Sequence, residues 1–197
     1  MVFIYVPLSI SVLGLFKTLH SESLLITTDP IMIKKQQATF KDFLQKFPKI
    51  SLPVTLTEDS HHDFSKTNDP IPALMVEEFL MKLETEEVDE FTEYIPCFRI
   101  PKTDGFTAIV YFKAGLLNYE YNLLTFNKDG LSIDKKVIAG TKVDGNQLQR
   151  TVATIEDDWI IYCVRGVTAA DNPIYDSTTS ESLHLELLAT GEIIFST

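Results

Sequence analysis

The stretch GFTAIVYFKAGLLNYEYNLLTFNKDGLSIDKKVIA, residues 105–139, decides the fold. Two runs within it, 105–114 and 119–127, are rich in the aromatic and aliphatic residues typical of β-strands, and a third strand-like run ends the stretch. Asp129 and Gly130 precede the third run and form a strong β-hairpin signal, because glycine accepts the positive φ of a tight turn. The stretch therefore predicts consecutive antiparallel strands.

The same alternation of strand-like runs and turn signals continues along the rest of the chain. Strand-like runs occur at 150–156, 158–166, 182–189 and 192–197, and turn signals at 143–146, 156–158 and 190–192. Short strands in series with tight turns predict an antiparallel meander that begins near Tyr94.

A short amphipathic helix is predicted before the strands, in TFKDFLQKFPKISLP at 39–53. The apolar residues Phe40, Phe43, Leu44 and Phe47 stand at i, i+3, i+4 and i+7, which places them on one helical face. Thr39 is the expected N-cap, with Asp42 in a weakened capping box. Pro48 disfavours helical geometry at Phe47 and should end the helix.

A second short helix is predicted in ALMVEEFLMKLE at 73–84, where Val76, Phe79, Leu80 and Leu83 repeat the apolar stripe. The intervening segment 57–70 is polar and is predicted to be a loop. Isolated helices of this length are marginal in water, so both need a surface to cover. The sheet is the expected partner.

These patterns predict an α+β fold in which two short N-terminal helices pack on an antiparallel meander of about seven to nine strands. The chain is 45% hydrophobic and 23% charged, as in ordinary globular proteins. Residues 36–197 are expected to form a single domain. Residues 1–35 are expected to form an apolar N-terminal segment and a connector.

The first sixteen residues, MVFIYVPLSISVLGLF, carry no charge, and Lys17 follows them. This length suits the apolar core of a signal peptide better than a membrane-spanning helix, although basic residues before the run and an A-x-A cleavage site are missing. We therefore expect an exported or cell-envelope protein, with membrane contact only through this segment if it stays uncleaved. The alternative is a cytoplasmic protein whose N-terminus is a core strand.

Charge and cysteine content exclude several classes of function. The formal net charge of -11 and the absence of a basic stripe argue against a nucleic-acid partner. Cys97 and Cys163 are too few for a disulfide framework and lack the spacing of a zinc or redox motif. They are two buried thiols or a single bridge, and no cofactor is expected.

Five segments form a combination seen in one group of proteins. They are FKDFLQKFPKISLP at 40–53, IPCFRI at 95–100, GFTAIVYFKAG at 105–115, YNLLTFNKDG at 121–130 and TGEIIF at 190–195, with the second predicted helix after the first of them. In these segments the chain resembles uncharacterised exported proteins and lipoproteins of Bacteroidota. The resemblance covers roughly 39–195 and implies a bacterial envelope protein, but no activity, cofactor or catalytic residue. Unlike the lipoprotein members, this chain has no cysteine near its N-terminus.

The familiar catalytic motifs of hydrolases, nucleotide-binding proteins and zinc proteases are missing. The densest group of possible metal ligands is Asp59, His61, His62 and Asp63. Adjacent histidines in an extended chain point in opposite directions, which argues against both binding one ion. Asp59 and His61 remain the candidate metal ligands of a rival function, a metal-dependent hydrolase with its site near this loop and the acidic run 84–93.

The acidic run itself, ETEEVDEFTE, lacks the alternating D-x-D-x-D-G pattern of a calcium loop. It is interpreted as a solvated linker between the second helix and the sheet.

The long connection VTAADNPIYDSTTSES, 167–182, is the candidate contact surface, because functional residues favour loops held on a rigid scaffold. Its candidate binding residues are Asn172, Tyr175, Asp176 and Ser177. The sequence therefore predicts a non-enzymatic exported or envelope-associated protein that contacts another protein through this loop or through exposed sheet.

Overall fold

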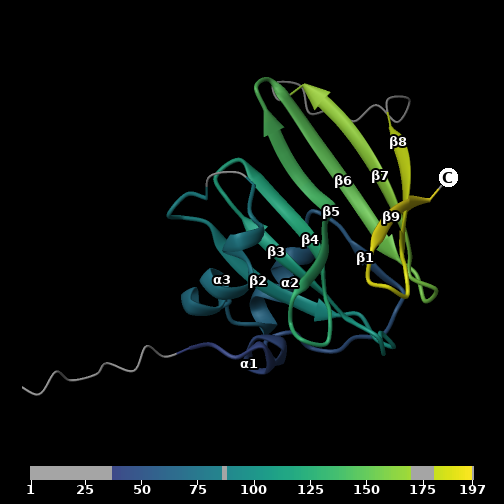
Figure 1. Cartoon of the computed structure of the whole chain (residues 1–197). Coiled ribbons are helices and arrows are strands. Elements are labelled where there is room, and N and C mark those ends of the chain that lie inside the picture. Colours follow the sequence, from purple (N-terminus) through teal and green to yellow (C-terminus); the bar gives the residue numbers. More distant parts are fainter. Residues whose placement is uncertain (1–36, 86–87, 170–179, 197) are drawn as a thin grey trace, which may run out of the picture. The chain divides into compact units, whose positions relative to one another are not determined.

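The computed structural model describes residues 37–85, 88–169 and 180–196 of the 197-residue chain (Figure 1). Gln36–Thr197 forms one compact unit. The predicted apolar segment 1–35 lies outside the described residues. None of the helices in the described part of the chain is long and apolar enough to cross a membrane.

Nine strands of the described residues form one antiparallel sheet, so the fold is mainly β and the predicted meander is confirmed. The strands are β1 (Val54–Leu56), β2 (Glu93–Arg99), β3 (Thr107–Ala114), β4 (Asn118–Phe126), β5 (Ser132–Asp144), β6 (Gln147–Ile155), β7 (Ile160–Ala169), β8 (Glu181–Leu187) and β9 (Ile193–Ser196). Strands β2 to β9 are neighbours in chain order, and β1 pairs with β6.

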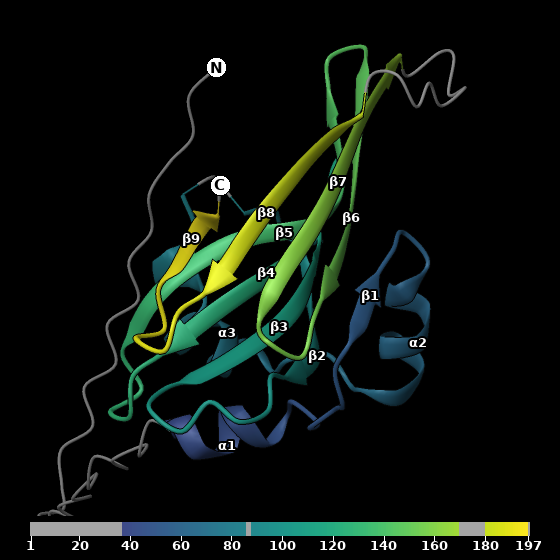
Figure 2. The ribbon, with the colours of Figure 1, turned by 90° about the vertical axis from the view of Figure 1, so that its right-hand side faces the viewer.

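Strand β5 connects the two halves of the sheet and changes partner along its length. Its residues from Ser132 to Lys142 pair with β4, and those from Gly140 to Asp144 pair with β6. β5 pairs with β6 only as far as Thr151, and from Ala153 to Ile155 the neighbour of β6 on this side is β1. The sheet curves, so that β6–β9 lie across one face of β2–β4 (Figure 2).

Two buried clusters lie on opposite faces of β2–β4. The larger cluster fills the space inside the curved sheet and includes Phe112 and Leu123 from the first half and Ile161 and Leu185 from the second. The smaller cluster lies beneath the helices α1 (Phe40–Gln45) and α3 (Ala73–Phe79) and the 3-10 turn η1 (Met81–Leu83). Burial on both faces explains the nearly continuous apolar runs of β3 and β4.

Helix α1 begins where the sequence predicts. Thr39 Oγ1 accepts a hydrogen bond from Asp42 N at 3.2 Å and donates one to Asp42 Oδ2 at 2.6 Å, which caps the first turn. Phe43 and Phe47 are fully buried against the sheet. The predicted packing of α1 and α3 on the meander is confirmed.

The prediction that 57–70 is a loop is wrong. Residues Ser60–Thr67 form a third helix, α2, with the Ser60 side chain accepting a hydrogen bond from Thr57 N at 2.9 Å. The helix is almost entirely polar and is held to the inner cluster through Phe64, whose ring lies 5.8 Å from that of Phe98. One apolar residue in a polar run produces no periodic pattern, so the sequence did not reveal the helix.

The structure decides between the two expectations for the cysteines. Cys97 and Cys163 are both free thiols buried in the inner cluster. Cys163 Sγ donates a hydrogen bond to Ile138 O at 3.3 Å.

Candidate binding site

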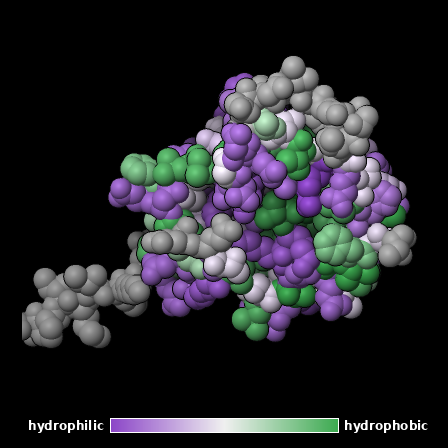
Figure 3. Space-filling view, turned by 90° about the horizontal axis from the view of Figure 1, so that it is seen from above, coloured by the Kyte–Doolittle hydropathy of each residue, from purple (hydrophilic) through white to green (hydrophobic). Residues whose placement is uncertain are grey.

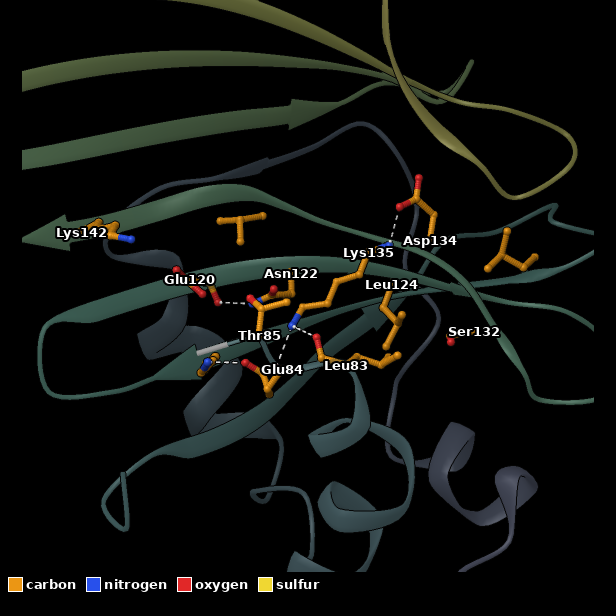
Figure 4. Close-up of a pocket in the computed structure, with 13 residues that line it drawn as sticks. Leu83, Glu84, Thr85, Glu120, Asn122, Leu124, Ser132, Asp134, Lys135 and Lys142 are labelled. Atoms are coloured by element: carbon orange, nitrogen blue, oxygen red, sulfur yellow. Dashed lines mark hydrogen bonds and ion pairs between the residues drawn. The ribbon is translucent and has the colours of Figure 1, made fainter. Parts of the chain in front are cut away.

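A cavity of about 550 Å³ lies on the helix side of the sheet, where α3 and η1 leave β3, β4 and β5 uncovered (Figure 4). Residues 83–85, the last residue of η1 and the two after it, form one wall, and side chains of the three strands form the rest. We call it the lysine pocket, because Lys113, Lys135 and Lys142 all line it. Its volume lies in the range of about 300–1,000 Å³ that is usual for small-molecule sites.

An ion triad lies in the wall of the lysine pocket. Lys135 Nζ donates hydrogen bonds to Glu84 Oε1 at 2.7 Å and to Leu83 O at 3.3 Å, and Lys113 Nζ donates to Glu84 Oε2. The side chain of Glu84 is 5% exposed, that of Lys113 12% and that of Lys135 21%. Both oxygens of the carboxylate are therefore occupied by lysines from two different strands.

The protonation of Glu84 follows from these neighbours. Burial is the largest single influence and raises its pKa, but the hydrogen bonds and charges of Lys113 and Lys135 together hold the pKa of Glu84 below its usual value. The carboxylate is ionised at neutral pH, and the triad carries a net charge of about +1.

The two ammonium groups have more donors than the triad uses. Each ammonium has three N–H groups. Lys135 directs two of them to Glu84 and Leu83, and Lys113 directs one to Glu84. Within the described part of the chain, no further acceptor is within hydrogen-bonding distance of either. The triad therefore presents spare donors and a local positive charge, whereas the full lining of the pocket, which also contains Glu120, Asp134 and Lys142, is balanced in formal charge.

The floor of the lysine pocket contains buried polar groups without partners. Asn122 is fully buried and lies directly across the ladder from Tyr111. Its Nδ2 donates a long hydrogen bond of 3.4 Å to Glu120 O, whereas its Oδ1 has no partner among the described residues. A buried acceptor without a protein partner is uncommon, because such atoms usually bond to water or to a ligand.

Tyr111 lies beneath Glu84 and stays neutral. Burial, followed by the charge of Glu84, raises the pKa of its hydroxyl well above the usual value. Tyr111 is therefore a neutral donor at any physiological pH.

The predicted metal ligands lie elsewhere, beside a smaller pocket of about 230 Å³ lined by His61, Phe112, Tyr119 and Tyr121 among others. His61 stacks on Phe112 with ring centroids 5.1 Å apart, and its Nδ1 donates to Glu58 O at 2.6 Å.

Because α2 is helical, the rings of His61 and His62 lie 3.9 Å apart instead of pointing in opposite directions as expected of an extended chain. Asp59 precedes the helix and makes no side-chain capping bond. In the described ranges no three His, Cys, Asp or Glu side chains are grouped to hold a metal ion. Metal binding by Asp59 and His61 stays a prediction.

The acidic run 84–93 is only partly the solvated linker that the sequence predicts. Its first residue, Glu84, is buried in the triad, while Asp89 accepts a hydrogen bond from Phe91 N at 2.8 Å. The sequence carries one signal for this difference. Glu84 stands four residues after Leu80 and so shares the apolar face of the predicted second helix.

The contact patch predicted for the long connection is the remaining candidate site. Asn172, Tyr175, Asp176 and Ser177 lie outside the described residues. The connection that contains them is shorter than predicted, because β7 continues to Ala169 and β8 begins at Glu181.

The chain was compared with models of protein families, with curated proteins and with solved structures. No match was found in any of the three. We therefore infer function from the charges and geometry of the lysine pocket.

Proposed function

We propose that the protein is a non-enzymatic binding protein whose lysine pocket holds a small organic carboxylate. The observation that carries this proposal is the surplus of ammonium donors on Lys113 and Lys135 at the wall of a ligand-sized cavity. A carboxylate accepts several N–H donors at once and neutralises the surplus charge, and charge-assisted hydrogen bonds are the strong ones.

The state of the cysteines supports a binding role over nucleophilic catalysis. Burial raises the pKa of the Cys163 thiol to about 11 and that of Cys97 further still. Neither is a thiolate at neutral pH, and both lie in the inner cluster, away from the lysine pocket. Glu84, Lys113 and Lys135 are instead ionised and paired with one another, which suits recognition of a charged ligand.

Lys135→Met should weaken carboxylate binding at least tenfold, because it removes one ammonium from the pocket wall while keeping an unbranched side chain of similar length. A tenfold loss corresponds to about 1.4 kcal/mol. The measurement is calorimetric titration at pH 7 with succinate, glutarate, L-aspartate and L-glutamate. The thermal melt of each variant would show that it is folded at the temperature of titration.

The matched control is Lys66→Met. Lys66 lies on α2, outside the pocket lining, and pairs with Asp63 at 3.8 Å, both side chains being exposed. This variant should bind as the unchanged protein does. Absence of binding by all four acids, or equal losses in the two variants, would contradict the proposal.

A second candidate function, contact with another protein, is favoured by the outer face of the second half of the sheet. Val152 of β6 and Val164 of β7 lie opposite each other and are both exposed. Exposed Tyr162 extends this face and packs its ring against that of His184, 4.9 Å away. In the view from above, hydrophilic side chains surround smaller hydrophobic patches (Figure 3). Clustered exposed apolar residues mark many interaction sites.

A photoreactive amino acid tests this second function in the cell that makes the protein. Placed at Val164, it should form an adduct of one defined mass. Placed at Leu116, which is also apolar and is more exposed, in the turn after β3, it should not. Equal labelling at both positions, or none, would count against a protein contact on this face.

We also propose export, for which the apolar run at the N-terminus is the support. Removing Met1–Lys35 should change the thermal midpoint by less than about 2 °C, because Gln36–Thr197 is compact by itself and both buried clusters lie within it. The intact mass and cell fraction of full-length protein with a C-terminal tag complete the test. A full-length chain in the cytosol, together with a large loss of stability on deletion, would favour the cytoplasmic alternative.

A further inference from the structure

The geometry points to an α-amino acid as the carboxylate that the lysine pocket binds. Its carboxylate group would meet the ammonium groups of Lys113 and Lys135, and its ammonium group would meet Glu120. This inference rests on the proposed function and adds the chemical class of the ligand.

Glu120 would be the partner of the ligand's ammonium group. It lines the lysine pocket from β4 and lies directly across the ladder from Lys113. Despite this register, Glu120 forms no ion pair within the described ranges, because Lys113 is directed to Glu84. A half-buried carboxylate without a cation is costly unless water or a ligand compensates it.

Asn122 lies two residues along β4 from Glu120, on the same face. Its Nδ2 faces Glu120 O at 3.4 Å, which assigns the orientation of the amide and leaves Oδ1 as the orphaned acceptor. Glu120 and Asn122 lie side by side in the pocket (Figure 4). One part of the pocket therefore needs hydrogen-bond donors.

The two parts of the pocket differ in charge and in the hydrogen-bonding groups that they offer. Spare donors and positive charge lie at Lys113 and Lys135, and spare acceptors and negative charge lie at Glu120 and Asn122. A simple carboxylate pairs with the two lysines but is repelled by Glu120. A simple amine pairs with Glu120 but is repelled by the two lysines. A ligand with adjacent carboxylate and ammonium groups satisfies both sets, and leaving out either group would leave buried polar atoms unpaired.

Matched pairs of acids that differ only in the α-ammonium group test the inference. Calorimetric titrations of the full-length protein at pH 7 would compare L-aspartate with succinate, L-glutamate with glutarate, and L-norvaline with pentanoate. We expect at least one amino acid to bind ten or more times as tightly as its partner.

Glu120→Gln should abolish this preference by weakening amino-acid binding, with the simple acid bound equally well or better. Glu186→Gln on β8, outside the pocket, is the matched control and should keep the preference. Retained preference in Glu120→Gln would overturn the inference.

The outcomes separate this inference from the proposed function. Equal binding of both members of every pair would overturn the amino-acid inference and leave carboxylate binding intact. Absence of binding by all six acids would overturn the proposed function and the inference with it.

Discussion

Glu84→Gln should lower the free energy of unfolding by about 3 kcal/mol at pH 7. The substitution keeps the shape of the side chain but removes the only charge that the triad supplies to Lys113 and Lys135, two ammonium groups that are 12% and 21% exposed. Breaking a buried ion pair by removing one partner is costly because it leaves uncompensated charge. The residual exposure of the lysines places the expected loss at the lower end of the usual range.

The same substitution should change how stability depends on pH. The pKa of Glu84 is lowered in the folded protein, so the carboxylate stabilises the fold above the pKa of about 4.3 that it has in the unfolded chain. This contribution is lost as the pH falls through the lowered pKa. The difference between the unchanged protein and Glu84→Gln should therefore be largest near neutrality and shrink below about pH 4.

Urea unfolding at pH 7 and at pH 3 measures both effects, and Glu78→Gln is the matched control. Glu78 pairs with Lys82 at 2.9 Å on the exposed side of the α3 segment, where an i,i+4 pair contributes only about 0.3–0.5 kcal/mol. Equal losses in the two variants at pH 7 would contradict the buried triad. A difference independent of pH would contradict the lowered pKa.

The strands and two of the helices could be predicted because their cues are local. The pair Asp129 and Gly130 indicates a turn through backbone freedom alone, and Gly130 has the positive φ that such a turn requires. The stripe of Phe40, Phe43 and Phe47 indicates α1 because a helix places these residues on one face. No contact distant in sequence is needed for either prediction.

The lysine pocket could not be predicted, because it depends on register between distant segments. Lys113 and Lys135 lie on different strands, and Glu84 comes from the connector after η1. In the sequence, Glu84 is one acid among several, and Lys113 and Lys135 each lie within an ordinary strand. Only the pairing of β3 with β4 and of β4 with β5 brings the three charges together.

Gly140 allows β5 to pair with a strand of each half of the sheet. It pairs with Glu120 of β4 on one side and with Thr151 of β6 on the other, at φ 138°. A Cβ atom at this position would lie 2.0 Å from Tyr119 O and 3.0 Å from Glu120 Cα. Both contacts are with backbone, which cannot move without disrupting the β4–β5 ladder.

Gly140→Ala should therefore destabilise the protein by about 3–4 kcal/mol, as the sum of a disfavoured backbone conformation and a clash with the neighbouring strand. Gly145→Ala in the β5–β6 turn is the matched control, because its φ of 57° is also positive but nothing lies within 4 Å of its added Cβ. We expect it to cost only about 1 kcal/mol.

Urea unfolding measures the difference, and hydrogen exchange of the β4 and β5 amides locates it if Gly140→Ala is only partly folded. Exchange should accelerate in the β4–β5 ladder first, since that is where the added methyl group separates the strands. Equal destabilisation by the two alanines would mean that β4 and β5 do not approach as closely at Gly140 as the register requires. The chain would then pass between the halves of the sheet by some other bend, and the smaller pocket beside His61, which Gly140 also lines, would have a different wall.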